Sequence, residues 1–203
     1  GPLAQAMVLN NDDKPDEALK VIDEALQQQP QQARLLAQKA VLLLSKKQMA
    51  EAAALYKQAA QLAEKPQQKY SYLYQIGRLA AVEQQDKAAG KAALQQFIDF
   101  YKDGENQQLS WARVRLAQIH LLEQNKTDAE QTLQPVLALA DKPEKLEKEL
   151  ELIEESAIKE IQYLLLKLEG TFTTALSTFS YEGQKRLIKF LFDYFMENEI
   201  PIW

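Results

Sequence analysis

Residues 34–66, RLLAQKAVLLLSKKQMAEAAALYKQAAQLAEKP, contain two apolar helical stretches separated by a polar segment at residues 46–49. Leucines surround Ala40 in the first stretch, and Ala52 opens the second, with Tyr56 and Ala59 following at helical spacing. Small residues at fixed places allow two helix backbones to approach closely, and large residues fill the space around them. We therefore expect an antiparallel helical hairpin. Because one hairpin cannot bury its apolar face alone, we expect it to stack on similar hairpins.

The same spacing of 12 between two small residues occurs at four places in the chain. The four pairs are Ala6 with Ala18, Ala40 with Ala52, Gly77 with Ala89, and Ala117 with Ala129. The interval from one pair to the next grows from 34 to 37 and then to 40 residues. The added residues fall in loop-forming sequences at residues 65–68 and 102–106, which is where insertions between repeats are tolerated.

This period and these small positions resemble the tetratricopeptide repeat (TPR), a helical hairpin of 34 residues with small residues at its eighth and twentieth places. Pro30 matches the proline that ends the family's repeat, and Ile22 and Ala25 match packing places of its second helix. The third repeat departs from this pattern, with Ala93 and Gln96 at two such places. Over about residues 3–143 the resemblance implies an all-α, right-handed superhelical solenoid.

The composition changes near Pro143. Residues 1–142 hold 25 Ala and 23 Gln, whereas residues 143–203 hold two of each. We therefore expect a repeat domain of about four helix pairs over 1–142 and a separate C-terminal module over 143–203. That module is expected to be a long helix (144–169) followed by a hydrophobic helix (181–198).

The C-terminal helices carry a predicted hydrophobic surface formed by Phe190, Tyr194, Phe195, Ile202 and Trp203. Three roles remain open for it. It can cap the end of the solenoid, since an array needs an end that covers its last apolar face. It can form a surface for a second copy or another protein. It can also be a partner segment joined to its receptor, because such a break in composition also arises where two sequences of different origin are joined in a chimera.

Composition excludes several classes of site. The formal net charge of −5 argues against a nucleic-acid footprint, which needs a clustered basic face. The absence of cysteine excludes disulfides and thiolate metal sites, and it suits cytoplasm and periplasm equally. No apolar run is long enough to span a membrane.

Gly1-Pro2 is typical of a cleaved expression tag, so we expect the natural chain to begin earlier.

Nothing in the sequence predicts an enzyme, a cofactor or a metal. The one histidine, His120, cannot form a two-histidine metal site, and it falls at a packing place of the fourth repeat, where we expect it to be buried or half-buried. The carboxylates Glu154 and Glu155 are adjacent and therefore point apart, which is poor geometry for shared acid–base chemistry. No glycine-rich phosphate loop is present.

The resemblance implies that first-helix residues line an inner groove that holds a peptide or a helix of another protein. Transferred to this sequence, the predicted groove residues are Arg34, Val41, Tyr74, Arg78, Trp111 and Gln118. Tyr74, Arg78 and Trp111 are predicted as the main anchors, because Tyr, Trp and Arg carry most of the energy in interfaces. The alternative for Tyr74 and Trp111 is packing between repeats.

A carboxylate clamp is not expected in this groove. Chaperone-binding members of the family carry Lys and Asn at two places where this chain has the pairs Ala37/Val41, Tyr74/Arg78 and Val114/Gln118. We therefore predict a protein-interaction scaffold or adaptor that does not serve the chaperones Hsp70 or Hsp90. The alternative is a structural subunit that forms a homo-oligomer through its C-terminal helices.

Overall fold

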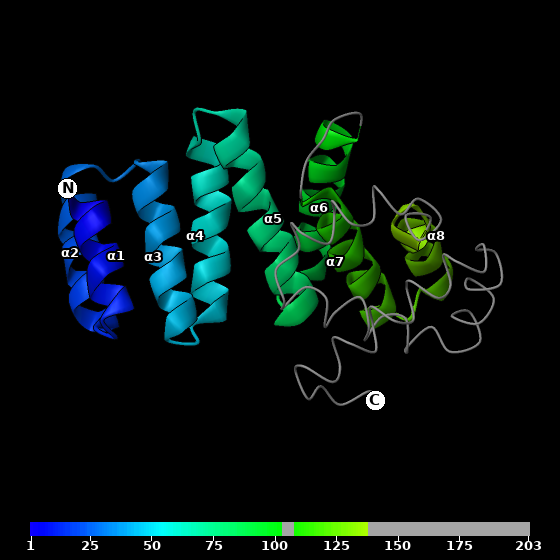
Figure 1. Cartoon of the computed structure of the whole chain (residues 1–203), viewed down its shortest axis with the longest axis horizontal. Helices are drawn as coiled ribbons and strands as arrows, with labels where there is room; N and C mark the ends of the chain where they lie inside the picture. Colours follow the sequence, from blue (N-terminus) through cyan, green and yellow to red (C-terminus); the bar gives the residue numbers. More distant parts are fainter. Residues whose placement is uncertain (103–107, 138–203) are drawn as a thin grey trace, which may run out of the picture. The chain divides into compact units, whose positions relative to one another are not determined.

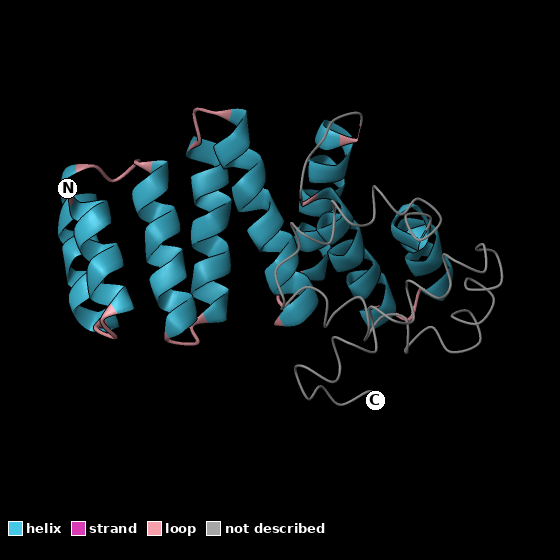
Figure 2. Ribbon diagram, in the orientation of Figure 1, coloured by secondary structure: helices cyan, strands magenta, loops and turns pink. Residues whose placement is uncertain are grey.

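The structure, a computed structural model, describes residues 1–102 and 108–137, and all regular structure in these ranges is α-helical (Figure 2). The helices are α1 (Pro2–Asn11), α2 (Pro15–Gln28), α3 (Ala33–Ser45), α4 (Met49–Leu62), α5 (Pro66–Val82), α6 (Lys87–Tyr101), α7 (Leu109–Leu122) and α8 (Lys126–Leu137). They form the pairs predicted by the 12-residue spacing. No described helix has both the length and the apolar character needed to cross a membrane.

The chain divides into two compact units, residues 1–97 and 98–203, and α6 crosses from one to the other. In the first unit, α1 to α5 follow one another side by side, each next to the helix before it (Figure 1). In the second unit, α7 packs against α8. The predicted boundary near residue 143 stays a prediction. The C-terminal module, with Phe190, Tyr194, Phe195, Ile202 and Trp203, lies outside the described residues.

The small residues lie where helices meet, as the spacing predicts. The side chains at six of the eight places have no exposed surface: Ala6, Ala18, Ala40, Ala52, Ala117 and Ala129. At Gly77 the approach is closer still. A Cβ atom built there would lie 2.2 Å from Cγ of the fully buried Leu94, so α6 packs directly on the backbone of α5. Only glycine leaves that space.

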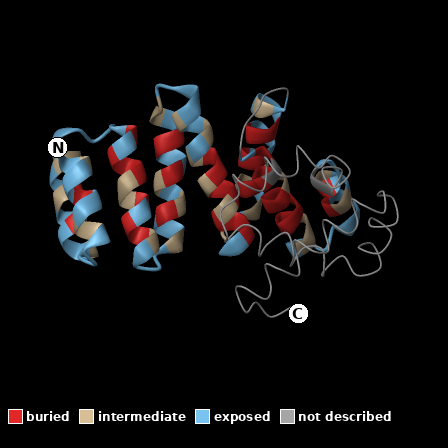
Figure 3. Ribbon diagram, viewed as in Figure 1, coloured by how far each residue is buried: buried red, intermediate tan, exposed pale blue. Residues whose placement is uncertain are grey.

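Helix α3 is shared between two hydrophobic clusters. Leu35 and Leu42, seven residues apart, pack in a cluster with three residues of the first pair, Ala6, Ala18 and Ile22. Leu36, Ala40 and Leu43 belong to a second cluster with residues of α4, α5 and α6. Within the first unit, α3, α4 and α5 accordingly carry more buried residues than α1 and α2, which are mostly exposed or half-buried (Figure 3). The leucines on either side of Ala40 therefore pack against the helices on both sides of α3.

The turn inside each pair repeats with the period of the small residues. One residue in each turn has a positive φ: Asp13 (59°), Lys47 (60°), Gln84 (51°) and Gln124 (59°). In three of the turns the next amide donates to the carbonyl five residues earlier: Lys14 to Leu9 (2.8 Å), Gln48 to Leu43 (2.9 Å) and Asn125 to His120 (2.8 Å). These are Schellman motifs, which satisfy the last carbonyls of the first helix.

Lys47→Gly is expected to raise the free energy of unfolding by about 0.5–1 kcal/mol. Lys47 has a positive φ, and in this left-handed region only glycine avoids a steric clash of the Cβ atom. Removing that clash stabilises the folded chain by more than the added conformational entropy of glycine stabilises the unfolded chain. Urea denaturation followed by circular dichroism measures it. Lys46→Gly is the control, because φ at Lys46 is −94° and glycine gains nothing there. A Lys47→Gly protein that is less stable than the wild type would contradict this account.

Helix α8 contains a proline, Pro135, in its interior, where proline removes a backbone hydrogen bond and favours a kink or a local break. The helix continues past Pro135 to Leu137, so it is not broken there. Pro2, Pro15 and Pro66 instead lie in the first turns of their helices, where proline costs nothing.

Candidate functional site

A groove in the first unit is formed by the first helices of three successive pairs. It has a cavity volume of about 310 Å³. Its lining residues are Leu3 and Met7 from α1, Arg34, Ala37, Gln38 and Val41 from α3, Tyr56 from α4, and Ser71, Tyr72 and Gln75 from α5. This is the kind of surface that the TPR resemblance implies, and we call it the α1/α3/α5 groove.

Three of the six predicted groove residues are at this groove or near it. Arg34 and Val41 line it; Arg34 is exposed and Val41 is 38% exposed. Arg78 is half-buried on α5, and its guanidinium acts electrostatically on Tyr56, which lies in the lining. Binding of a partner by these residues stays a prediction.

The other three predicted residues are buried. Tyr74 is 6% exposed, and its ring centroid lies 5.7 Å from that of Phe97. In the second unit, Trp111 is 4% exposed and Gln118 is 9% exposed. Their common neighbour is Arg115, with its Cζ 5.7 Å from the Trp111 ring centroid and its Nη1 donating to Oε1 of Gln118 (3.5 Å). The burial of Tyr74 and Trp111 agrees with the alternative that these side chains pack between repeats. It leaves little of either ring exposed to a partner.

Sequence reasoning missed the two tyrosines in the lining of the groove and the apolar residues that α1 contributes to it. Tyr56 and Tyr72 lie with ring centroids 6.4 Å apart. The apolar residues of α1 in the lining are Leu3 and Met7, and Met7 is 54% exposed. The TPR resemblance assigns groove positions only to residues in the first helix of each pair, and Tyr72 does not fall at one of those positions. The one signal was the cluster of tyrosines at the start of α5.

Charge in this groove is of one sign. Arg34 is the ionised side chain that lines it, and no Asp or Glu is among the described residues of its lining. Burial raises the pKa of Tyr56 to about 12, an effect that the nearby Arg78 opposes and Tyr72 reinforces. Burial also raises the pKa of Tyr72, and Arg34 opposes it. Both phenols are therefore neutral at ordinary pH, and each is close enough to a guanidinium group to be affected by its charge: Tyr56 by Arg78 and Tyr72 by Arg34.

Raising the pH from 10 to 12 is expected to lower the free energy of unfolding by about 2 kcal/mol through Tyr56. Its folded-state pKa lies above the ordinary value of 10.0. As the pH rises through 10, the unfolded chain therefore loses this proton first, so it binds fewer protons than the folded chain and stability falls. Urea midpoints at several pH values measure the slope. Tyr56→Phe should flatten it by that amount; an unchanged slope in this variant would show that Tyr56 titrates normally.

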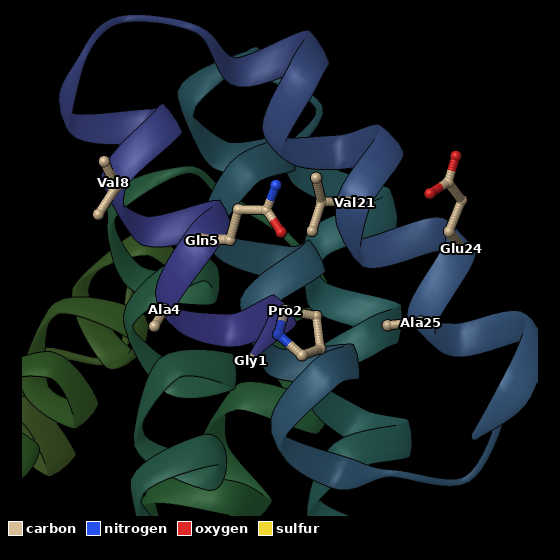
Figure 4. A pocket seen from close by; sticks show the side chains of 8 residues that line it. All are labelled: Gly1, Pro2, Ala4, Gln5, Val8, Val21, Glu24 and Ala25. Carbon is tan, nitrogen blue, oxygen red and sulfur yellow. The ribbon is translucent and has the colours of Figure 1, made fainter.

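A second hollow, of about 680 Å³, lies between α1 and α2 (Figure 4). It is lined by Gly1, Pro2, Ala4, Gln5, Val8, Val21, Glu24 and Ala25. Glu24 is the one ionisable side chain in this lining, so the hollow brings together no groups for catalysis or for metal binding. Across the described parts of the chain, no cluster of three or more His, Cys, Asp or Glu side chains is placed to hold a metal ion. His120 is half-buried, as expected from its place in the repeat.

Comparison with known proteins supports the fold. A scan against protein-family models finds no match, and neither does a search of curated proteins. Among solved structures, the chain is similar to the nearly identical TPR-like repeats of a Podosopora anserina protein assigned as a kinesin light chain. That match has a TM-score of 0.67 at 13% identity and covers 98% of this chain and 94% of that one.

A second similar structure is that of Naa15/Naa10 bound to HypK-THB, with a TM-score of 0.51 at 21% identity. It covers 96% of this chain but only 28% of the other. At these identities the likeness concerns the fold alone. The chain therefore has the all-α, TPR-like repeat fold that its spacing of small residues predicts.

Proposed function

We propose that this chain is a protein–protein interaction scaffold or adaptor, which holds a peptide or a helix of a partner protein in the α1/α3/α5 groove. The observation that carries the proposal is the groove itself, because three consecutive pairs each contribute their first helix to one continuous surface. On this proposal the chain is not an enzyme: it positions another protein and performs no chemistry of its own.

The composition of the groove suits a protein segment. Leu3, Met7 and Val41 offer apolar contact, while the exposed Arg34 and the half-buried Tyr72 offer directed hydrogen bonds. Tyrosine and arginine are enriched among the residues that dominate binding energy. The walls are rigid helices, so a partner would not have to order them on binding.

One similar structure gives further support. The Naa15/Naa10 structure is, by its description, bound to HypK-THB. A TPR-like fold of this kind therefore occurs within an assembly of proteins. The alternative function, self-association through the C-terminal helices, concerns residues outside the described ranges, and no described residue favours it.

Selection from a random-peptide display library tests the proposal directly. The full chain should enrich specific peptides, and these should bind about tenfold more weakly to a Met7→Gln/Val41→Gln variant, which loses two apolar side chains of the lining without a change of charge. The matched control is Val8→Gln/Val82→Gln. Val8 (59% exposed) and Val82 (37% exposed) are as accessible as Met7 and Val41 but do not line the groove.

Two results would contradict the proposal. The first is failure to enrich any peptide with a chain that is folded by circular dichroism. The second is equal binding of the enriched peptides to the wild type and to Met7→Gln/Val41→Gln. Weaker binding to the control variant than to the groove variant would likewise place the working surface elsewhere.

A further inference from the structure

The α1/α3/α5 groove concentrates positive charge in a chain that is acidic overall. The sequence has 29 Asp and Glu residues against 24 Lys and Arg residues. Despite this excess, the described lining of the groove contains a guanidinium group and no carboxylate. Arg78 lies beyond the lining but close enough to act on the floor residue Tyr56. The distribution of charge therefore differs at the groove from the chain as a whole.

Two carboxylates of the first unit form ion pairs away from the groove. Asp23 binds Lys39 of α3 at 2.8 Å, and Asp16 binds Lys46, directly after α3, at 2.5 Å. Within the described parts of the chain, neither ion pair includes Arg34 or Arg78. The two guanidinium groups are thus not neutralised by a carboxylate of the described chain.

Arg34 itself offers only donors to an occupant of the groove. Its guanidinium group has five N–H donors and no acceptor, and it is the one ionised side chain in the described lining. A carboxylate is the protein group that accepts two such bonds in the matching planar geometry. An apolar side chain next to that carboxylate would contact Met7 and Val41, which are 54% and 38% exposed.

We propose that the occupant of the α1/α3/α5 groove is an acidic segment of a partner protein, with a carboxylate on Arg34 and a neighbouring apolar side chain on the wall formed by Met7 and Val41. This inference rests on the proposed function and specifies its partner class. A basic segment would meet uncompensated like charge, so the same groups that attract an acidic segment exclude a basic one.

The test compares peptide selection by three forms of the full chain. One is the wild type, one is Arg34→Gln/Arg78→Gln, and one is the control Lys20→Gln/Lys57→Gln. The control removes the same charge from two exposed lysines on α2 and α4 that do not line the groove. Peptides enriched by the wild type and the control should contain at least about twice the library's fraction of Asp and Glu, and the arginine variant should return that fraction to the library level.

A binding titration with one enriched acidic peptide completes the test. Its affinity should fall about tenfold on the arginine variant, as loss of a charge-assisted hydrogen bond predicts, and should weaken as salt rises from about 50 to 300 mM. If the half-buried Arg78 proves necessary for folding, the exposed Arg34→Gln alone serves in its place.

The outcomes separate this inference from the proposed function. Enriched peptides without an acidic bias, lost on Met7→Gln/Val41→Gln, would overturn the acidic partner and leave the groove as the working surface. An acidic bias that survives removal of both arginines would overturn their role. Failure of the wild type to enrich any peptide would overturn both proposals.

Discussion

Phe97→Ala is expected to lower the free energy of unfolding by about 3–5 kcal/mol, the usual cost of deleting a buried aromatic ring. Phe97 is 1% exposed, and its ring packs against Tyr74 with centroids 5.7 Å apart. Truncation leaves a cavity between α5 and α6 and removes an aromatic pair. Urea denaturation followed by circular dichroism measures the loss.

Phe100→Ala is the matched control for this substitution. Phe100 lies on the same helix but is 49% exposed, and its described ring contact is with the adjacent Tyr101, at 4.8 Å. We expect it to cost about 1 kcal/mol or less, since surface substitutions are mild and an aromatic pair is worth about that much. Equal losses from the two alanine variants would show that Phe97 is not a core residue.

Leu42→Ala is expected to cost about 2–5 kcal/mol and to loosen the first helix pair selectively. Leu42 is fully buried in the cluster that joins α3 to α1 and α2 through Ala6, Ala18 and Ile22. Hydrogen exchange should therefore accelerate more in α1 and α2 than in α4, because stability is lost where the contacts are lost.

Val41→Ala, one residue away, is the control for Leu42→Ala. Val41 is 38% exposed and faces the groove, so its truncation should change the free energy of unfolding by about 0.5 kcal/mol. Uniform acceleration of exchange along the whole unit after Leu42→Ala would contradict the view that this side chain ties the first pair to the second.

The fold could be predicted because close helix packing places a strict demand on residue size. Ala40 and Ala52 have no exposed surface, and Gly77 has no space for a Cβ, so the interval between small residues carries the period of the array. The turns were harder to predict. Lys47 and Gln84 adopt a positive φ, although neither is a glycine and neither residue type favours this conformation.

The groove could be predicted only in part. A residue's position in the TPR repeat indicates which face of the helix it lies on, but not which side chains of neighbouring helices cover it. It placed Arg34 and Val41 in the lining. It also named Tyr74 as an anchor, whereas that ring is buried against Phe97, which comes 23 residues later in the chain. Tyr72 reaches the groove because of how α5 packs on α4, a contact that no local pattern encodes.

Site-specific photo-crosslinking tests most directly whether a partner segment binds in the α1/α3/α5 groove. Because the sequence has no cysteine, an introduced cysteine is the one site at which a thiol-reactive crosslinker attaches. A benzophenone attached at Ser71→Cys, in the groove, is compared with the same group at the exposed Gln58→Cys on α4, which does not line the groove. The account predicts that a peptide selected by the wild-type chain crosslinks efficiently from position 71 and at background level from position 58. Crosslinking from position 58 with none from position 71 would contradict it.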